Sequence, residues 1–143
     1  MQGLPTQDVG GVPMTAPSLT DFLLARIAED EEAARQVPRA PWDASAIGEA
    51  LGYDKEWVVD SPDRLIAGNI GIFEDPAAEP LAQWIARHDP ARVLAECEAK
   101  RRIVEMVEQK RLRNSITTSW VEALMALAAP YADHPDCRQE WAL

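Results

Sequence analysis

The sequence predicts an α+β fold that is mainly helical, with three to five helices and a small antiparallel β-hairpin or three-stranded sheet. Two observations favour helices: apolar residues recur at helical spacing, and Ser, Asp and Pro stand where helix ends are expected. A third favours the sheet, because two short apolar runs flank a Ser-Pro-Asp turn. Together these patterns indicate an α+β layout.

The length and composition indicate one domain preceded by an extension. The chain has 143 residues, of which 47% are hydrophobic, too large an apolar share for a disordered chain. Residues 1–17 contain three glycines and three prolines and show no periodicity. We therefore expect a flexible N-terminal extension over 1–17 and a single α+β domain over 18–143.

The charge restricts the classes of partner. The formal net charge is -10 and the isoelectric point is about 4.6, which disfavours direct nucleic-acid binding and attachment to anionic membranes. A basic protein partner fits the charge better. No apolar run reaches the ~18 residues of a membrane span, and the N-terminus lacks the pattern of a signal peptide. With two cysteines and no disulfide framework, we expect a cytoplasmic protein.

The first helix is expected to begin after Ser18, a suitable N-cap, and to end before Pro38. Leu19, Phe22, Leu23 and Ile27 recur at helical spacing and define its apolar face. The acidic run at 29–32 is interpreted as a solvated face, with a patch for a basic partner or a metal as the alternative.

The middle of the chain is expected to form the sheet. Trp42 is expected to anchor the chain on the core, and residues 43–56 are ambiguous between a short helix and a loop. The run 56–68 is typical of a hairpin around Ser61-Pro62-Asp63. Residues 69–73 either extend the second strand or start a third.

Three further helices complete the expected architecture. The first runs over 81–87 with Leu81, Trp84 and Ile85 on its core face, and the second begins at Asp89-Pro90 and continues to about residue 113. A capping box starting at Ser119 predicts the third, and 134–141 is expected to add a short helical turn. The apolar positions expected on the second are Val93, Leu94, Cys97, Val104 and Val107.

No motif of a known catalytic class is present: the chain has no phosphate-binding glycine loop, GxSxG, HExxH or CxxC. Three weaker hypotheses remain. His88 or His134, beside Asp89 or Asp133, could perform acid–base work, and Arg87 with Arg92 could bind an anion at the helix start. The weak candidates for a zinc site, set against buried or ordinary polar roles, are His88, Cys97, His134 and Cys137.

Several blocks together resemble a known family: "FLLARIAEDEEAA", "PW", "ARHDPARVL…EAKRRI" and "YADHPD". The chain is similar over residues 15–141 to a family of small acidic proteins from actinobacteria and their phages, for which no activity is established. The resemblance therefore implies a source and a context, but no mechanism. The binding candidates carried by the matching blocks are Arg87, His88, Asp89, Arg92, Lys100, Arg101, Tyr131, Asp133 and His134.

The function expected from these observations is non-enzymatic. We expect an accessory protein that binds a macromolecule, most simply a protein, with a phage or mobile-element host modulator as one form of that role. No cofactor is expected, and the 90–113 helix could form a homodimer. The alternative is a small ligand- or metal-binding protein or enzyme, with a site that the "RHDPAR" and "YADHPD" blocks form together.

Overall fold

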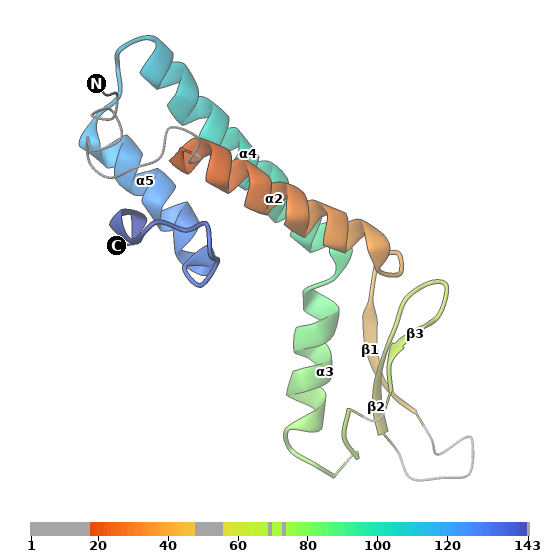
Figure 1. Ribbon diagram of the computed structural model, residues 1–143. Helices are drawn as coiled ribbons and strands as arrows, with labels where there is room; N and C mark the ends of the chain where they lie inside the picture. The colour runs from red at the N-terminus through yellow and green to blue at the C-terminus, as the bar shows by residue number, and fades with distance from the viewer. Residues whose placement is uncertain (1–17, 48–55, 69, 73, 143) are drawn as a thin grey trace. The chain divides into compact units, whose positions relative to one another are not determined.

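The computed structural model describes residues 18–47, 56–68, 70–72 and 74–142. The predicted extension over 1–17 lies outside these residues. Within these residues the structure is α+β and mainly helical, as predicted, with four α-helices and a three-stranded antiparallel sheet (Figure 1). Its elements, in chain order, are α2 (Leu19–Gln36), β1 (Asp43–Ile47), β2 (Glu56–Asp60), β3 (Leu65–Ala67), α3 (Ala78–Arg87), α4 (Pro90–Leu112), α5 (Thr118–Ala128) and the short 3₁₀ helices η2 (Ala129–Tyr131) and η3 (Gln139–Trp141).

The chain divides into two compact units. Unit 1 comprises residues 1–26 and 101–143, and unit 2 comprises residues 27–100. The helices α2 and α4 each contribute residues to both units, because the boundaries fall inside them. Among the described residues, no helix has the length and apolar character needed to cross a membrane.

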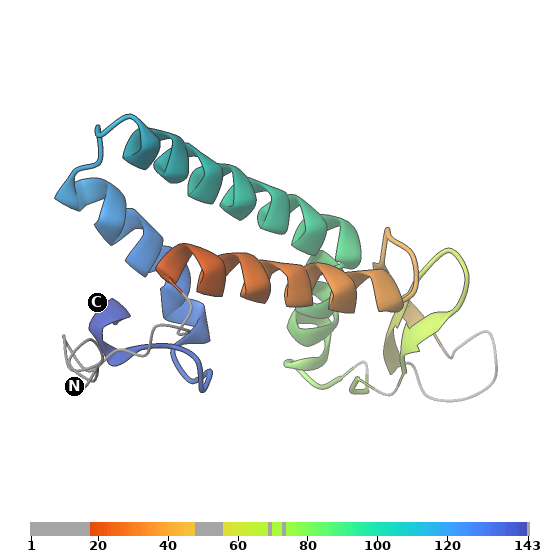
Figure 2. The same cartoon turned by 45° about the horizontal axis from the view of Figure 1, so that its top comes forward.

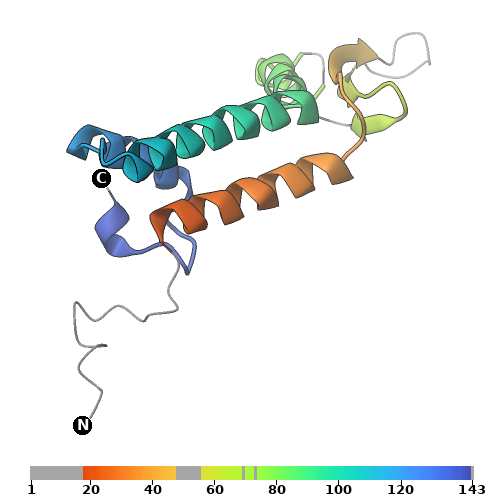
Figure 3. The same cartoon turned by 90° about the horizontal axis from the view of Figure 1, so that it is seen from above.

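Unit 1 contains the start of α2, the end of α4, α5 and the C-terminal segment. Ser18 caps α2 as predicted, because the backbone N–H of Asp21 donates to its Oγ at 3.1 Å. Thr20 on α2 donates to Glu108 on α4 at 2.6 Å. Figure 3 shows the start of α2 and the end of α4, both of which belong to this unit. The C-terminal segment returns to the start of α2, where Trp141 packs against Phe22 at a centroid distance of 5.2 Å (Figure 2).

The start of α5 corrects one prediction. Thr117, not Ser119, is the N-cap, and its side chain makes no capping hydrogen bond. The capping box expected from Ser119 is therefore wrong, and the backbone N–H of Val121 instead bonds the carbonyl of Thr117. The short turn predicted near the C-terminus is present as η3.

Unit 2 contains the sheet and α3. The predicted hairpin is β2 and β3, and Ser61 closes its turn by bonding the backbone of Arg64. Residues 70–72 also pair with β2, because Trp57 exchanges backbone hydrogen bonds with Ile70 and Gly71. They therefore continue the pairing of the second hairpin strand, which was one of the two predictions for this segment. The sheet has the order β1-β2-β3.

The first strand corrects a second prediction. Residues 43–47 form β1, not the short helix or loop expected there, while 48–55 lie outside the described residues. This segment has little intrinsic preference for strand, but pairing with β2 places Ala44 opposite the buried Val59. Tertiary packing therefore overrides local propensity.

The face of α3 that packs on the sheet corrects a third prediction. Leu81 and Trp84, expected in the core, are 48% and 61% exposed, and Ile85 is half-buried as part of the core cluster. The helix also begins at Ala78, three residues earlier than expected, since Pro80 is compatible with a first turn. The buried positions are Ala78, Ala82 and Ala86.

Small residues allow this close packing. An added Cβ at Gly71 would lie 2.7 Å from the Cβ of Ala78, so the start of α3 requires a glycine beside it. Ala82 and Ala86 cluster with Val59 in the same way. Because alanines make the closest contact with the sheet, Leu81 and Trp84 remain exposed, and Ile85 packs at the edge of the cluster.

Candidate functional site

A groove in unit 2 lies beside Arg87, one of the predicted site residues. It has a volume of roughly 560 Å³ and lies between α3 and the residues that lead into β1. Five α3 residues line it, and four of them have the spacing i, i+3, i+4, i+7, which is one stripe of a helix. Its complete lining is Trp42, Asp43, Ala44, Pro80, Gln83, Trp84, Ala86 and Arg87.

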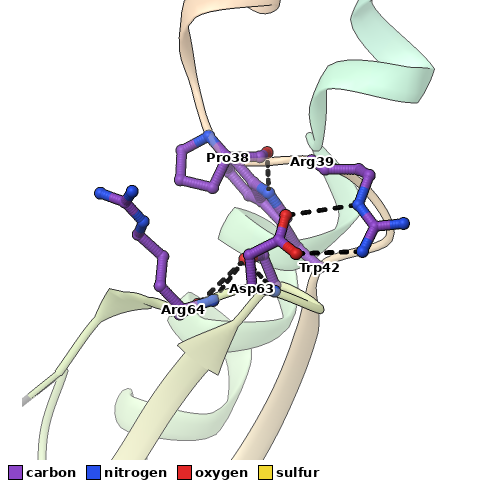
Figure 4. A network of polar contacts seen from close by, with 6 residues as sticks. Pro38, Arg39, Trp42, Asp63 and Arg64 are labelled. Atoms are coloured by element: carbon purple, nitrogen blue, oxygen red, sulfur yellow. Dashed lines mark hydrogen bonds and ion pairs between the residues drawn. The ribbon is translucent and has the colours of Figure 1, made fainter.

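Trp42 forms one wall, and hydrogen bonds hold it in place. Its indole Nε1 donates to the carbonyl of Pro38 at 2.9 Å, and its backbone N–H donates to Asp89 Oδ2 at 3.3 Å. The same linker carries Arg39, which bonds both carboxylate oxygens of Asp63 in the β2–β3 turn (Figure 4). This hydrogen bonding lowers the pKa of Asp63 and raises that of Arg39. The Trp42 wall is therefore preorganised before any ligand binds.

Trp84 forms the opposite wall. Its ring stacks on His88 with centroids 4.2 Å apart and planes 30° apart. His88 Nδ1 lies 2.7 Å from the carbonyl of Trp84, so Nδ1 must carry the hydrogen and donate. His88 thus closes α3 and supports the indole, which explains why a histidine precedes the cap of α4.

Asp89 has a structural role. Its Oδ1 accepts the backbone N–H of Arg92 at 3.0 Å, which makes it the predicted N-cap of α4, while Oδ2 accepts from Trp42. Arg92 pairs with Glu96 at 2.9 Å and thereby lowers the pKa of that carboxyl. Of the "RHDPAR" block, Arg87 alone lines the groove.

An acidic pair lies at the β1 side of the groove. Asp43 is a lining residue and is directly opposite Asp60 in the β1–β2 register. Like charges at opposite positions of an antiparallel pair destabilise it. No cation among the residues that the structure describes forms an ion pair with either carboxylate. Among the described residues, Asp43 thus places at the β1 side of the groove a carboxylate without an ion-pair partner, while Arg87 lines the α3 side.

The "YADHPD" block lies in unit 1 and packs on α2. His134 Nδ1 accepts from the guanidinium of Arg26 at 2.9 Å and from the backbone N–H of Asp136 at 3.0 Å. The ring hydrogen of neutral His134 is therefore on Nε2, the opposite of His88. The rings of Tyr131 and His134 both make T-shaped contacts with the Phe22 ring. These contacts make the block a packing and hydrogen-bonding cluster around a buried arginine.

The remaining predicted residues are accounted for one by one. Lys100 and Arg101 are half-buried on α4 and each already interacts with other groups, whereas Asp133 is exposed. Cys97 is buried on α4 and Cys137 is half-buried. Within each unit, the described residues contain no cluster of three or more His, Cys, Asp or Glu side chains suited to a metal. The hypothesis that "RHDPAR" and "YADHPD" form one site stays a prediction.

The sequence reasoning missed most of the groove. Gln83 was not considered, Trp84 was assigned to the core, and Asp43 was assigned to an ambiguous segment. One signal was present in the sequence. Residues 80, 83, 84 and 87 have the spacing of one helical face, just as the apolar residues 81, 84 and 85 do. Reading the alanines at 78, 82 and 86 as the buried face would have revealed it.

Comparison with known proteins identifies the family. No curated protein and no solved structure matched the chain. A family model matches residues 16–143, which is nearly the whole chain. The chain therefore belongs to the family of unknown function DUF6221.

Proposed function

We propose that this is a non-enzymatic accessory protein that acts by binding a protein partner through unit 2. The single observation that carries the proposal is Trp84, a large aromatic residue that is 61% exposed on a groove wall beside Arg87. Tryptophan and arginine are the residues most enriched among those that dominate binding energy at protein interfaces. Trp84 stacks on His88 but is not part of the core cluster that joins α3 to the sheet.

Charge supports a basic partner. Unit 2 contains 16 acidic and 7 basic residues, a net charge of -9, whereas unit 1 contains 8 acidic and 7 basic residues, a net charge of -1. Almost all of the negative charge of the chain therefore belongs to the unit that holds the groove. Such a field accelerates association with a positively charged surface and repels nucleic acid. Direct nucleic-acid binding is not part of the proposal.

The setting that we propose follows the resemblance of the sequence blocks. A source in actinobacteria or their phages and a cytoplasmic location would make the partner a host protein and the role that of a modulator. This part of the proposal rests on analogy with the family and on the two free cysteines.

Site-specific photo-crosslinking tests the proposal. A photoreactive amino acid replaces Gln83 in the groove, and in a matched control it replaces Glu122, an exposed residue of α5 in unit 1. In actinobacterial cells we expect the Gln83 probe to capture a discrete partner that the Glu122 probe does not. Equal capture at both positions, or recovery of no protein from Gln83 at low salt, would refute partner binding through this groove.

A homodimer is the competing outcome. The captured protein would then be a second copy of this chain, and light scattering of the purified protein would show twice the monomer mass. That result would replace the heterologous partner with self-association through unit 2.

A further inference from the structure

The α3 wall of the groove presents hydrogen-bond donors that have no partner. The indole N–H of Trp84, the carboxamide of Gln83 and the guanidinium of Arg87 form no side-chain hydrogen bond with any residue in the described part of the chain. By contrast, the indole of Trp42 already donates to Pro38. The groove is thus rich in donors along one helix face, so a well-matched ligand would supply carbonyl acceptors.

The apolar surface of the groove defines the shape of such a ligand. Trp42 and Trp84 provide aromatic walls, and Pro80, Ala44 and Ala86 complete an apolar lining. Aromatic-lined grooves recognise polyproline II segments, because the proline ring stacks on an indole and the helix is already ordered before binding. Proline also has no backbone N–H, so an oligoproline exposes carbonyls without donors of its own. This chemistry complements three unpartnered donors.

The acidic side of the groove adds a requirement for positive charge. The Asp43–Asp60 pair has no cation partner among the described residues, and unit 2 as a whole carries a net charge of -9. A lysine or arginine beside the prolines would relieve the repulsion between these carboxylates. The net charge of unit 2 therefore favours a basic segment over an acidic or neutral one.

We propose that the groove binds a proline-rich segment of a partner protein that carries a lysine or arginine beside its prolines. The inference rests on the proposed function and names the chemistry of its partner. Proline rings occupy the space between Trp42 and Trp84, and backbone carbonyls accept from Gln83, Trp84 and Arg87. The cation of the segment lies beside Asp43. Strand addition to β1 is a different mode, because it requires backbone N–H groups that prolines lack.

Calorimetric titration of the full chain with synthetic peptides tests the inference. The probe is a short oligoproline with an arginine at each end, and two matched peptides replace either the prolines with alanine or the arginines with glutamate. We expect the probe to bind about tenfold more tightly than the alanine peptide and the glutamate peptide not to bind measurably. Equal affinity for all three peptides, tighter binding of the alanine peptide, or no binding of the probe would overturn the inference.

Variants locate the binding. Trp84→Ala and Asp43→Asn should each lower the affinity for the probe by about tenfold, and Arg87→Gln should lower this affinity by a smaller factor. The control is Leu112→Ala in unit 1, which alters a residue that is 70% exposed and should leave the affinity unchanged. Circular dichroism checks each fold. If Trp84→Ala is folded and binds the probe like the wild type, the inference is wrong.

The outcomes separate this inference from the proposed function. A crosslinked partner that has no proline-rich basic segment at the contact would leave partner binding standing and would overturn the proline-rich occupant. Probe binding that Trp84→Ala weakens would support the occupant even before a partner is identified. Self-association that blocks the probe would assign the groove to a second copy of the chain and overturn the inference.

Discussion

The two units close their cores with side chains of different size. In unit 1, Phe22 is 1% exposed and contacts the rings of Tyr131, His134 and Trp141. In unit 2, the contact between α3 and the sheet is made by Ala82 and Ala86 with Val59. In unit 1, large aromatic side chains therefore fill the core and stabilise the fold.

This difference bears on function. Because alanines suffice to pack α3, its larger residues Leu81 and Trp84 remain exposed and can contact a partner. Unit 1 carries almost no net charge, and unit 2 carries nearly all of it. Packing and charge therefore both distinguish unit 2, the unit for which we propose partner binding, and each can be tested by a substitution that affects one unit.

The largest expected effect is in the aromatic core of unit 1. Phe22→Ala should lower the free energy of unfolding by about 3–5 kcal/mol, because it removes a buried ring and leaves a cavity among its neighbours. Urea denaturation followed by circular dichroism measures this loss. Trp84→Ala is the matched aromatic truncation in unit 2, and it should cost far less because Trp84 is exposed. A comparable loss in both variants would contradict the contrast between the units.

Enlarging a buried alanine should destabilise unit 2, just as truncating a buried aromatic residue should destabilise unit 1. Ala82 is 0% exposed, so Ala82→Leu forces α3 away from the sheet and should cost about 3 kcal/mol. Thermal or urea unfolding reports the change. Ala95→Leu on the exposed side of α4 is the control and should be within about 0.5 kcal/mol of the wild type. A tolerated Ala82→Leu would show that the alanine contact is not tight.

These alanines also show what the sequence could and could not predict. Most local signals with a short-range cause were confirmed, because Ser18 and Asp89 cap helices and the Ser61 turn joins two strands, although the capping box expected at Ser119 was wrong. β1 was missed because its strand conformation depends on pairing with β2, which lies beyond residue 55. Trp84 was assigned to the core because side-chain size favours burial on average, whereas distance to the sheet decides it here.

The candidate site was predicted less fully than the fold for the same reason. Arg87 was identified from its block and Asp89 was predicted as the N-cap of α4, whereas the contact between His88 and the Trp84 ring was not predicted. The second role of Asp89 depends on a partner distant in sequence, because Asp89 also accepts from Trp42, 47 residues away. Pairings over such separations depend on the whole fold, so no local pattern specifies them.

The buried arginine of unit 1 provides the third test. His134→Ala removes a hydrogen-bond acceptor of the Arg26 guanidinium. Because Arg26 is only 7% exposed, this substitution should lower the free energy of unfolding by about 2 kcal/mol. His134→Asn places a carboxamide oxygen near the position of Nδ1 and should recover part of the loss. Denaturant unfolding of both variants checks this order. Equal loss in Ala and Asn would mean that ring packing on Phe22, not the hydrogen bond, is what His134 contributes.

The cap of α4 provides a smaller test that connects stability with the groove. Asp89→Ala removes the N-cap acceptor and the acceptor for the backbone N–H of Trp42, and should cost about 1 kcal/mol. Asp89→Asn retains a capping oxygen and should be nearly as stable as the wild type. If the Trp42 wall depends on Asp89, the Ala variant should also bind the oligoproline probe more weakly. Unchanged stability of the Ala variant would show that the cap is dispensable.

The smallest expected effect is a pH dependence in unit 1. Hydrogen bonds from Arg111 and then Thr20 lower the pKa of Glu108 below its ordinary value. A carboxyl whose pKa is lower in the folded state adds stability above its unfolded pKa of about 4.3, and this contribution disappears as the pH falls through the folded value. The denaturation midpoint of Glu108→Gln should therefore lie below that of the wild type near neutral pH, with the gap narrowing at more acidic pH. A gap that stays constant or widens on acidification would show that the Glu108 charge adds nothing, and Glu122→Gln on exposed α5 controls for general charge effects.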